Sequence, residues 1–137
     1  EILRNANGLP VIFPIHPRTR KALIALDLPG EKLHLIDPLG YLEFNYLVQN
    51  AKAVLTDSGG ITEETTVLGI PCITLRDNTE RPETITEGTN ELIGTNPATI
   101  APALAKLFND SWKQTTVPEL WDGKTGERII EKLNQLL

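Results

Sequence analysis

The chain has 137 residues, of which 40% are hydrophobic and 23% charged, and a net charge of −5, a composition typical of one globular domain with its own core. The acidic balance and the lack of a Lys/Arg run argue against a nucleic-acid partner. A single cysteine excludes an internal disulfide or a cysteine-rich metal site, and no apolar run reaches membrane-spanning length, so we expect a cytoplasmic protein with no membrane partner.

The first residues read as the end of a helix. Residues 1–7 are followed by Gly8 and Pro10, which are helix stop signals. Because the sequence also contains no methionine, we expect the chain to be a fragment of a longer protein, cut inside or just before a helix.

Beyond this start, hydrophobic periodicity predicts alternating strands and helices. Strands are expected at 11–15, 33–36, 53–56, 71–75 and 91–94, and helices at 17–28, 41–50, 61–68, 96–108 and 127–137. Pro14 should lie at the end of its strand or at an irregularity, and Asn96 is expected to cap the helix that follows it. No helix or strand is predicted in the polar stretch 76–90.

This alternation predicts the fold. Strands that alternate with helices form a doubly wound, mainly parallel α/β sheet with right-handed crossovers. Ligands bind such sheets at the carboxyl ends of the strands. The loops that begin at Asp37, Asp57 and Arg76 all lie at that edge, so we expect the functional site there.

The most informative segment is the turn Asp57-Ser58-Gly59-Gly60 between a buried strand and a helix. Glycines let the backbone approach a ligand closely, and the unpaired N–H groups at a helix start attract phosphate. Alone, the turn could be merely structural, because the chain lacks the dinucleotide fingerprint and the Walker lysine. With its flanking residues, it indicates a phosphorylated ligand.

The charged residues around this turn refine the ligand. Glu63 and Glu64 are expected in the first helical turn, where carboxylates suit the helix dipole. We expect one of them to be structural and the other to accept hydrogen bonds from ribose hydroxyls, which makes the ligand a nucleotide. Arg76 and Arg81 either bind phosphate or form ion pairs within their own loop, and their place at the binding edge favours phosphate for at least one of them.

The remaining reactive side chains give weaker signals. His16, at a strand end before a proline, is either a ligand or acid–base group or a residue that hydrogen-bonds its loop. His34 and Cys72 are expected to be structural, with Cys72 in the core. Trp112 and Trp121 are predicted to be packing residues. No metal-ligand cluster and no catalytic triad is evident, so we expect neither a metal nor another cofactor.

Five segments, taken together and in order, resemble one family, the non-hydrolysing UDP-N-acetylglucosamine 2-epimerases, in their carboxyl-terminal part. They are His16-Pro17-Arg18-Thr19, Asp37-Pro38-Leu39-Gly40-Tyr41-Leu42, Asp57-Ser58-Gly59-Gly60-Ile61-Thr62-Glu63-Glu64, Arg76-Asp77-Asn78-Thr79-Glu80-Arg81-Pro82-Glu83 and Gly88-Thr89-Asn90.

The resemblance implies a Rossmann-like fold, one half of a two-domain enzyme of the glycosyltransferase-B type. Residues 1–137 would then be the carboxyl-terminal UDP-binding domain without its first strand–helix unit, and the amino-terminal domain would be absent. The full-length enzyme is expected to be a homodimer.

The resemblance also implies roles for individual residues. Ser58, Gly59 and Gly60 would hold the diphosphate of UDP or UDP-GlcNAc, and Glu64 would hold the ribose. Arg81 would contact the nucleotide, and Phe44 would line the uracil together with the loop near Leu39. A further role follows for His16, which matches a histidine near a second UDP-sugar site between the domains.

The implied reaction interconverts UDP-GlcNAc and UDP-ManNAc. UDP is eliminated to give 2-acetamidoglucal and then adds back, with a proton delivered to the opposite face of C2. The residues that move this proton are expected in the amino-terminal domain, so the isolated chain is expected to be inactive. The alternatives are the nucleotide-sugar half of a glycosyltransferase, a hydrolysing epimerase, and a non-catalytic nucleotide-binding or dimerising module.

Overall fold

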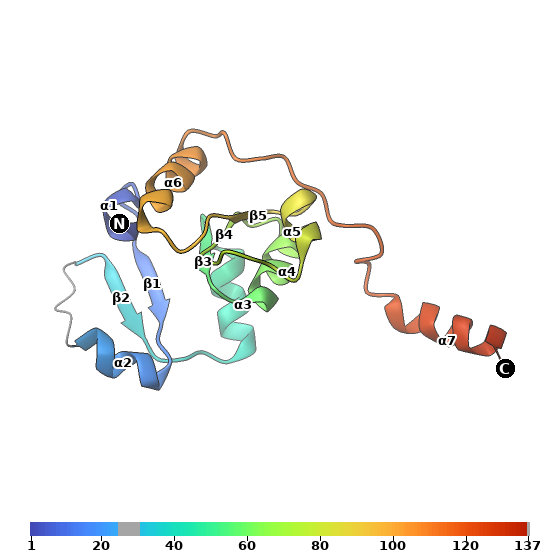
Figure 1. Ribbon diagram of the computed structural model, residues 1–137. Helices are drawn as coiled ribbons and strands as arrows, with labels where there is room; N and C mark the ends of the chain where they lie inside the picture. Colours follow the sequence, from blue (N-terminus) through green and yellow to red (C-terminus); the bar gives the residue numbers. More distant parts are fainter. Residues whose placement is uncertain (25–30, 137) are drawn as a thin grey trace.

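The computed structural model describes residues 1–24 and 31–136. Figure 1 shows an α/β arrangement in which helices connect short parallel strands. The elements in order are α1 (Ile2–Asn5), β1 (Val11–Pro14), α2 (Pro17–Ile24), β2 (Leu33–Ile36), α3 (Tyr41–Gln49), β3 (Val54–Thr56), α4 (Gly59–Leu68), β4 (Cys72–Thr74), α5 (Pro82–Thr86), β5 (Asn90–Leu92), the 3₁₀ turn η1 (Pro97–Thr99), α6 (Ile100–Phe108) and α7 (Thr125–Leu136).

The strands are parallel, as predicted, but they form two sheets rather than one. β1 pairs with β2, and β3, β4 and β5 form a second sheet in that order. One common doubly wound sheet has the strand order 3-2-1-4-5-6. The observed order fits this scheme if β2 and β1 take positions 3 and 2, and β3 to β5 take positions 4 to 6. Position 1, between β1 and β3, holds no strand among the described residues.

The core lies between the second sheet and α6. Ile73 on β4 is fully buried and packs with Ile100, Ala103, Leu104 and Leu107 of α6. These four residues recur at helical spacing on one face of α6, which is why the helix buries one side and exposes the other. By contrast, Ile12 and Phe13 on β1 remain 46% and 40% exposed.

Helix α4 packs on the sheet through threonines instead of aliphatic side chains. Thr62, Thr65 and Thr66 are at most 2% exposed. Their hydroxyls donate to carbonyls one turn earlier in the same helix, at 2.6 to 3.1 Å. Because each hydroxyl is satisfied within α4, this face needs no polar partner from the elements packed against it.

Several boundaries differ from the predictions for physical reasons. α4 begins at Gly59 rather than at residue 61, so Glu63 and Glu64 lie in its second turn, and the expectation that they lie in the first was wrong. The stretch expected to lack regular structure contains α5, which starts with Pro82 at a position where a missing N–H costs nothing.

Other predictions are confirmed. Pro14 is the last residue of β1. Asn96 caps the turn before α6, where its Oδ1 accepts from the N–H of Ala98 at 3.0 Å. Cys72 is fully buried, and burial raises the pKa of its thiol. Trp112 packs against the core. The predicted helix 17–28 is present to Ile24, and its remainder lies outside the described residues.

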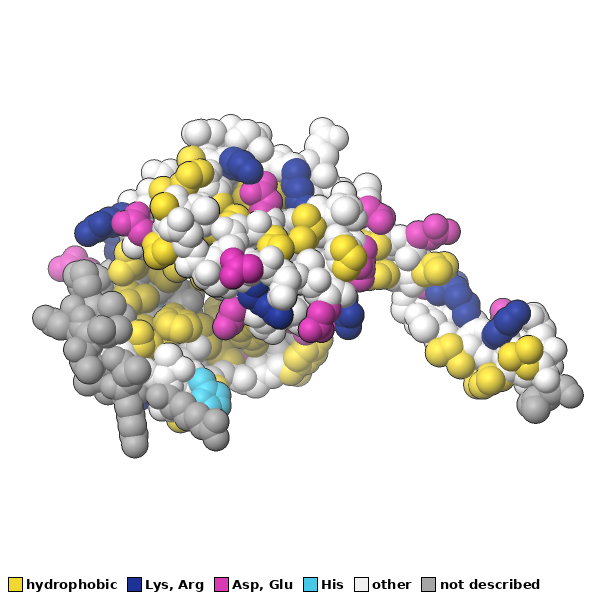
Figure 2. Space-filling view, in the orientation of Figure 1, with side chains coloured by type: hydrophobic (Ala, Val, Ile, Leu, Met, Phe, Trp, Pro, Cys, Tyr) yellow, Lys and Arg dark blue, Asp and Glu magenta, His cyan; other side chains and the backbone are white. Residues whose placement is uncertain are grey.

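The last helix stands apart from this body. α7 projects away at the end of an extended segment (Figure 1) and exposes hydrophobic side chains (Figure 2), among them Ile129, Ile130, Leu133 and Leu136. Within residues 1–24 and 31–136, no helix combines the length and the apolarity needed to cross a membrane.

The contact between α4 and the turn after α5 gives a test of this packing. A Cβ atom added at Gly88 would lie 2.6 Å from Thr66 Cγ2 and 2.8 Å from the Thr84 carbonyl oxygen. Gly88→Ala should therefore lower the free energy of unfolding by about 1–3 kcal/mol, measured by denaturant unfolding followed through tryptophan fluorescence.

Gly60→Ala is the matched control, because its Cβ would meet nothing within 4 Å. This variant should be neutral or up to about 1 kcal/mol more stable than the unmodified chain. Equal stability of the two alanine variants would show that α5 does not pack on α4 as described.

Candidate functional site

The centre of the site is the turn from β3 into α4. Ser58 takes the N-cap position in an extended conformation, and its N–H donates to the Thr56 hydroxyl at 3.0 Å. No side chain caps the first turn of α4. Its leading N–H groups are therefore available to an anion, because the first four N–H groups of a helix have no partner within it.

Arg76 lies beside this helix start. Its Nη1 atom is 4.0 Å from the position that a Cβ atom of Gly59 would take. Its Nη2 atom donates weakly to the Asn78 side chain at 3.3 Å. Gly60, the next residue, faces open space. The structure thus brings an arginine next to uncapped amides, a combination that suits phosphate oxygens.

Arg81 pairs with a residue of α4 rather than with an acidic residue of its own loop. Its Nε forms an ion pair with Glu63 of α4, and both side chains are partly exposed. The hydrogen bond and charge of Glu63 raise the pKa of Arg81. Of the two adjacent glutamates, only Glu63 forms this ion pair.

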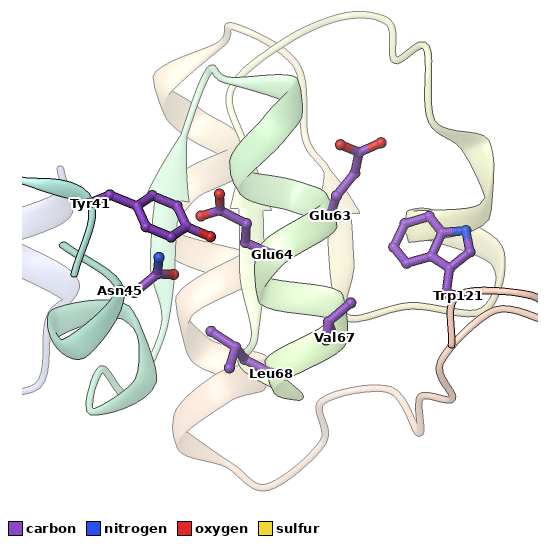
Figure 3. A pocket seen from close by; sticks show the side chains of 7 residues that line it. All are labelled: Tyr41, Asn45, Glu63, Glu64, Val67, Leu68 and Trp121. Atoms are coloured by element: carbon purple, nitrogen blue, oxygen red, sulfur yellow. The ribbon is translucent and has the colours of Figure 1, made fainter. Parts of the chain in front are cut away.

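A hollow of about 420 Å³ extends along the outward face of α4 (Figure 3). It is lined from α3, α4 and the segment before α7 by Tyr41, Asn45, Glu63, Glu64, Val67, Leu68 and Trp121. In Figure 3, Tyr41 and Asn45 point toward Glu64 from one side, and Trp121 lies on the other side. Aromatic rings beside carboxylates can accommodate a ligand that has a flat ring and hydroxyl donors.

Trp121 reaches this hollow because the segment before it is fastened to β5 and α5. The Lys113 ammonium donates to the carbonyls of Ile85 and Asn90, both at 2.6 Å, and partial burial lowers its pKa. The indole of Trp112 donates to the Thr89 carbonyl at 3.3 Å. The sequence predicts only a packing role for Trp121, because no local motif marks it as a residue of the site.

Of the residues predicted to bind the substrate, only Glu64 lines this hollow; the residues outside it are Ser58, Gly59, Gly60, Arg81 and Phe44. Phe44 is half-buried on α3 but does not line it, whereas Tyr41, one turn earlier, does. Leu39 lines a second hollow on α3, of about 460 Å³. His16 is exposed at the end of β1, in the other sheet, where its carbonyl accepts from Thr19 and Arg20 at the start of α2.

The site carries no sign of a metal centre. Among the residues that the structure describes, no three His, Cys, Asp or Glu side chains lie close enough to hold a metal ion.

Comparison with known proteins adds a family to this geometry. The family model described as UDP-N-acetylglucosamine 2-epimerase matches residues 1–134. The chain is 46% identical over 130 residues to the UDP-N-acetylglucosamine 2-epimerase of Methanocaldococcus jannaschii, which covers 90% of this chain and 34% of that protein.

Solved structures of relatives have the same fold. The M. jannaschii UDP-GlcNAc 2-epimerase in complex with UDP-GlcNAc and UDP matches with a TM-score of 0.75 and 45% identity, over 92% of this chain and 36% of that one. The Neisseria meningitidis UDP-GlcNAc 2-epimerase bound to UDP-GlcNAc matches with a TM-score of 0.81 and 33% identity, over 98% and 38%. The chain thus spans about a third of the length of the relatives it matches.

Proposed function

The chain belongs to the UDP-N-acetylglucosamine 2-epimerase family, and we propose that it holds the UDP moiety of a nucleotide sugar in such an enzyme. The observation that carries this proposal is the uncapped start of α4 after Ser58, with an arginine beside Gly59 and open space at Gly60. Phosphate binds helix starts of this kind because the N–H groups and the helix dipole both favour negative charge.

The proposed placement of UDP follows from this anchor. The amides of Ser58, Gly59 and Gly60 take the diphosphate, and Glu64 accepts hydrogen bonds from the ribose hydroxyls. Its position in the second turn of α4, rather than the first, supports this assignment because it keeps the carboxylate further from the phosphates.

Arg81 adds positive charge near the nucleotide when it is not fully engaged by Glu63. Phe44 as a contact to the base stays a prediction, and Tyr41 is the aromatic residue of α3 that faces the hollow. His16, in the other sheet, stays assigned to a second site between domains.

The proposed activity belongs to the longer protein. Removal of the C2 proton of UDP-GlcNAc and departure of UDP from C1 leave a C1–C2 double bond in 2-acetamidoglucal. Re-addition of UDP at C1, with a proton on the opposite face of C2, gives UDP-ManNAc. This chain binds the leaving group, UDP, and the proton-moving residues are assigned to an amino-terminal domain.

The proposed setting follows from the same assignment. We assign the longer protein a homodimeric state. We also assign it a cytoplasmic location, because Cys72, the single cysteine of this chain, is buried and unpaired, as is usual in reducing compartments.

The sheet geometry supports a domain that is completed by one further strand–helix unit. The N–H of Val11 bonds to the residue before β2, that of Ile15 bonds to the last residue of β2, and that of Val54 bonds to the residue before β4. Because successive residues of a strand bond on alternate sides, Ile12 and Leu55 face the space between the two sheets. We place the first strand of the domain there, with α1 as the end of its helix.

The first prediction concerns the ribose. UDP should bind about 10–100-fold more tightly than 2′,3′-dideoxy-UDP, because hydrogen bonds to a charged group contribute roughly 1.5–3 kcal/mol. Glu64→Leu should remove this preference, as measured by calorimetry, and Glu131→Ala on exposed α7 is the control that should keep it. A Glu64→Leu variant that still prefers UDP would refute the ribose assignment.

The second prediction concerns chemistry. The isolated chain, incubated with UDP-GlcNAc in D₂O, should neither form UDP-ManNAc nor incorporate deuterium at C2, as followed by proton NMR. The full-length M. jannaschii relative is the positive control. Deuterium at C2 in the presence of this chain alone would place proton-moving residues within it.

The third prediction concerns the missing strand. In this chain the amides of Ile12 and Leu55 should exchange with solvent much faster than those of Val11 and Val54, which are bonded within the sheets. A longer version that begins before the preceding strand should protect both amides. If the amides of Ile12 and Leu55 are already protected in the 137-residue chain, no strand position is open between β1 and β3.

A further inference from the structure

A buried polar side chain lies at the start of β5, the strand next to α5. Asn90, the first residue of β5, is fully buried. A buried amide is costly unless its donors and acceptor find partners. An apolar residue of the same size would fill this position with less constraint, so the partners of Asn90 indicate what its amide does.

Those partners form a continuous chain of hydrogen bonds from β4 to the start of α5. The Thr74 hydroxyl donates to Asn90 Oδ1 at 2.6 Å, and Asn90 Nδ2 donates to the Thr84 hydroxyl at 3.3 Å. The Thr84 hydroxyl in turn donates to the Arg81 carbonyl at 2.7 Å. Thr74 and Thr84 are at most 2% exposed, so water does not compete for these bonds.

The chain of bonds ends on the residue proposed to contact the nucleotide. Arg81 is the N-cap of α5, and its carbonyl also accepts from the Thr84 N–H at 3.1 Å. Two hydrogen bonds from one residue fix the orientation of the Arg81 backbone. Its side chain then extends back to Glu63 on α4.

We propose that Asn90 is a positioning residue that acts through Thr84 to hold Arg81 in place for the nucleotide, an inference that rests on the proposed function. The chain of hydrogen bonds from Thr74 through Asn90 and Thr84 to Arg81, called the relay below, ties the first turn of α5 to the sheet. At the other end of α5, Gly88 packs against Thr66 of α4. The helix that carries Arg81 is thereby fixed at both ends.

A double-mutant cycle on the full 137-residue chain tests this role. Asn90→Leu should weaken UDP binding about 5–10-fold, measured by calorimetry, because the Arg81 turn loses its support. In an Arg81→Ala background the same substitution should cost less than about twofold, since nothing is left for it to position. Equal losses in both backgrounds would overturn the proposal.

Two further variants separate positioning from general destabilisation. Thr84→Val breaks the relay one step closer to Arg81 and should reproduce the loss, also if Asn90→Leu fails to fold. Thr65→Val removes an equally buried hydroxyl that bonds to carbonyls of its own helix and to the Cys72 thiol, and none of these bonds leads to Arg81. It should leave UDP affinity within about twofold, even where it lowers the melting temperature. If Thr65→Val lowered UDP affinity as much as Thr84→Val does, the loss would be due to general destabilisation, and the proposal would be wrong.

A readout without ligand keeps the relay distinct from the proposed function. The Arg81 Nε–H should exchange with solvent about tenfold faster in Thr84→Val and Asn90→Leu than in the unmodified chain, as measured by NMR. Unchanged exchange in both variants would overturn the relay whether or not UDP binds. Failure of the unmodified chain to bind UDP, together with faster exchange in the variants, would refute the proposed function and leave the relay standing.

Discussion

The packing of helix α4 through short hydroxyl side chains is the constraint on which the site depends. The hydroxyls of Thr62, Thr65 and Thr66 donate to carbonyls within the helix. The helix therefore presents short side chains to the sheet, with their hydrogen-bond donors already used. Small side chains allow close approach, which is why Gly88 can lie against Thr66 with no room for a Cβ atom. Larger aliphatic residues on this face would displace α4, and the turn at Ser58 would move with it.

The opposite face of the same helix carries the two glutamates of the candidate site. Glu63 and Glu64 are adjacent, but the structure gives them different surroundings, because the Arg81 ion pair engages only Glu63. In the hollow, Glu64 faces Tyr41 and Asn45 of α3. An arginine beside the helix start and a second one paired to a carboxylate also offset the acidic character of a chain with a net charge of −5.

The sequence was informative where local signals coincide with tertiary structure. Glycines after a buried strand located the turn at Ser58, and the alternation of apolar stretches predicted every strand within two residues. It was less informative where distant segments decide the outcome. The segment before Trp121 is held to α5 and β5 by Lys113 and to Glu87 by the N–H of Thr116, and nothing near Trp121 in the sequence encodes these contacts. The division into two sheets depends on pairing between strands, which periodicity within one strand does not report.

The division into two sheets has a thermodynamic consequence. β3, β4 and β5 share a core with α6, whereas β1 and β2 leave Ile12, Phe13 and Leu35 at least 40% exposed. The two sheets share no strand pairing among the described residues, and contacts of α1 with α6 and of α3 with α4 connect them. Such a chain need not melt as one cooperative unit. The β1–β2 unit can open at a lower free energy than the rest, while the glycine turn, Glu64 and Arg81 stay folded together in the more stable unit.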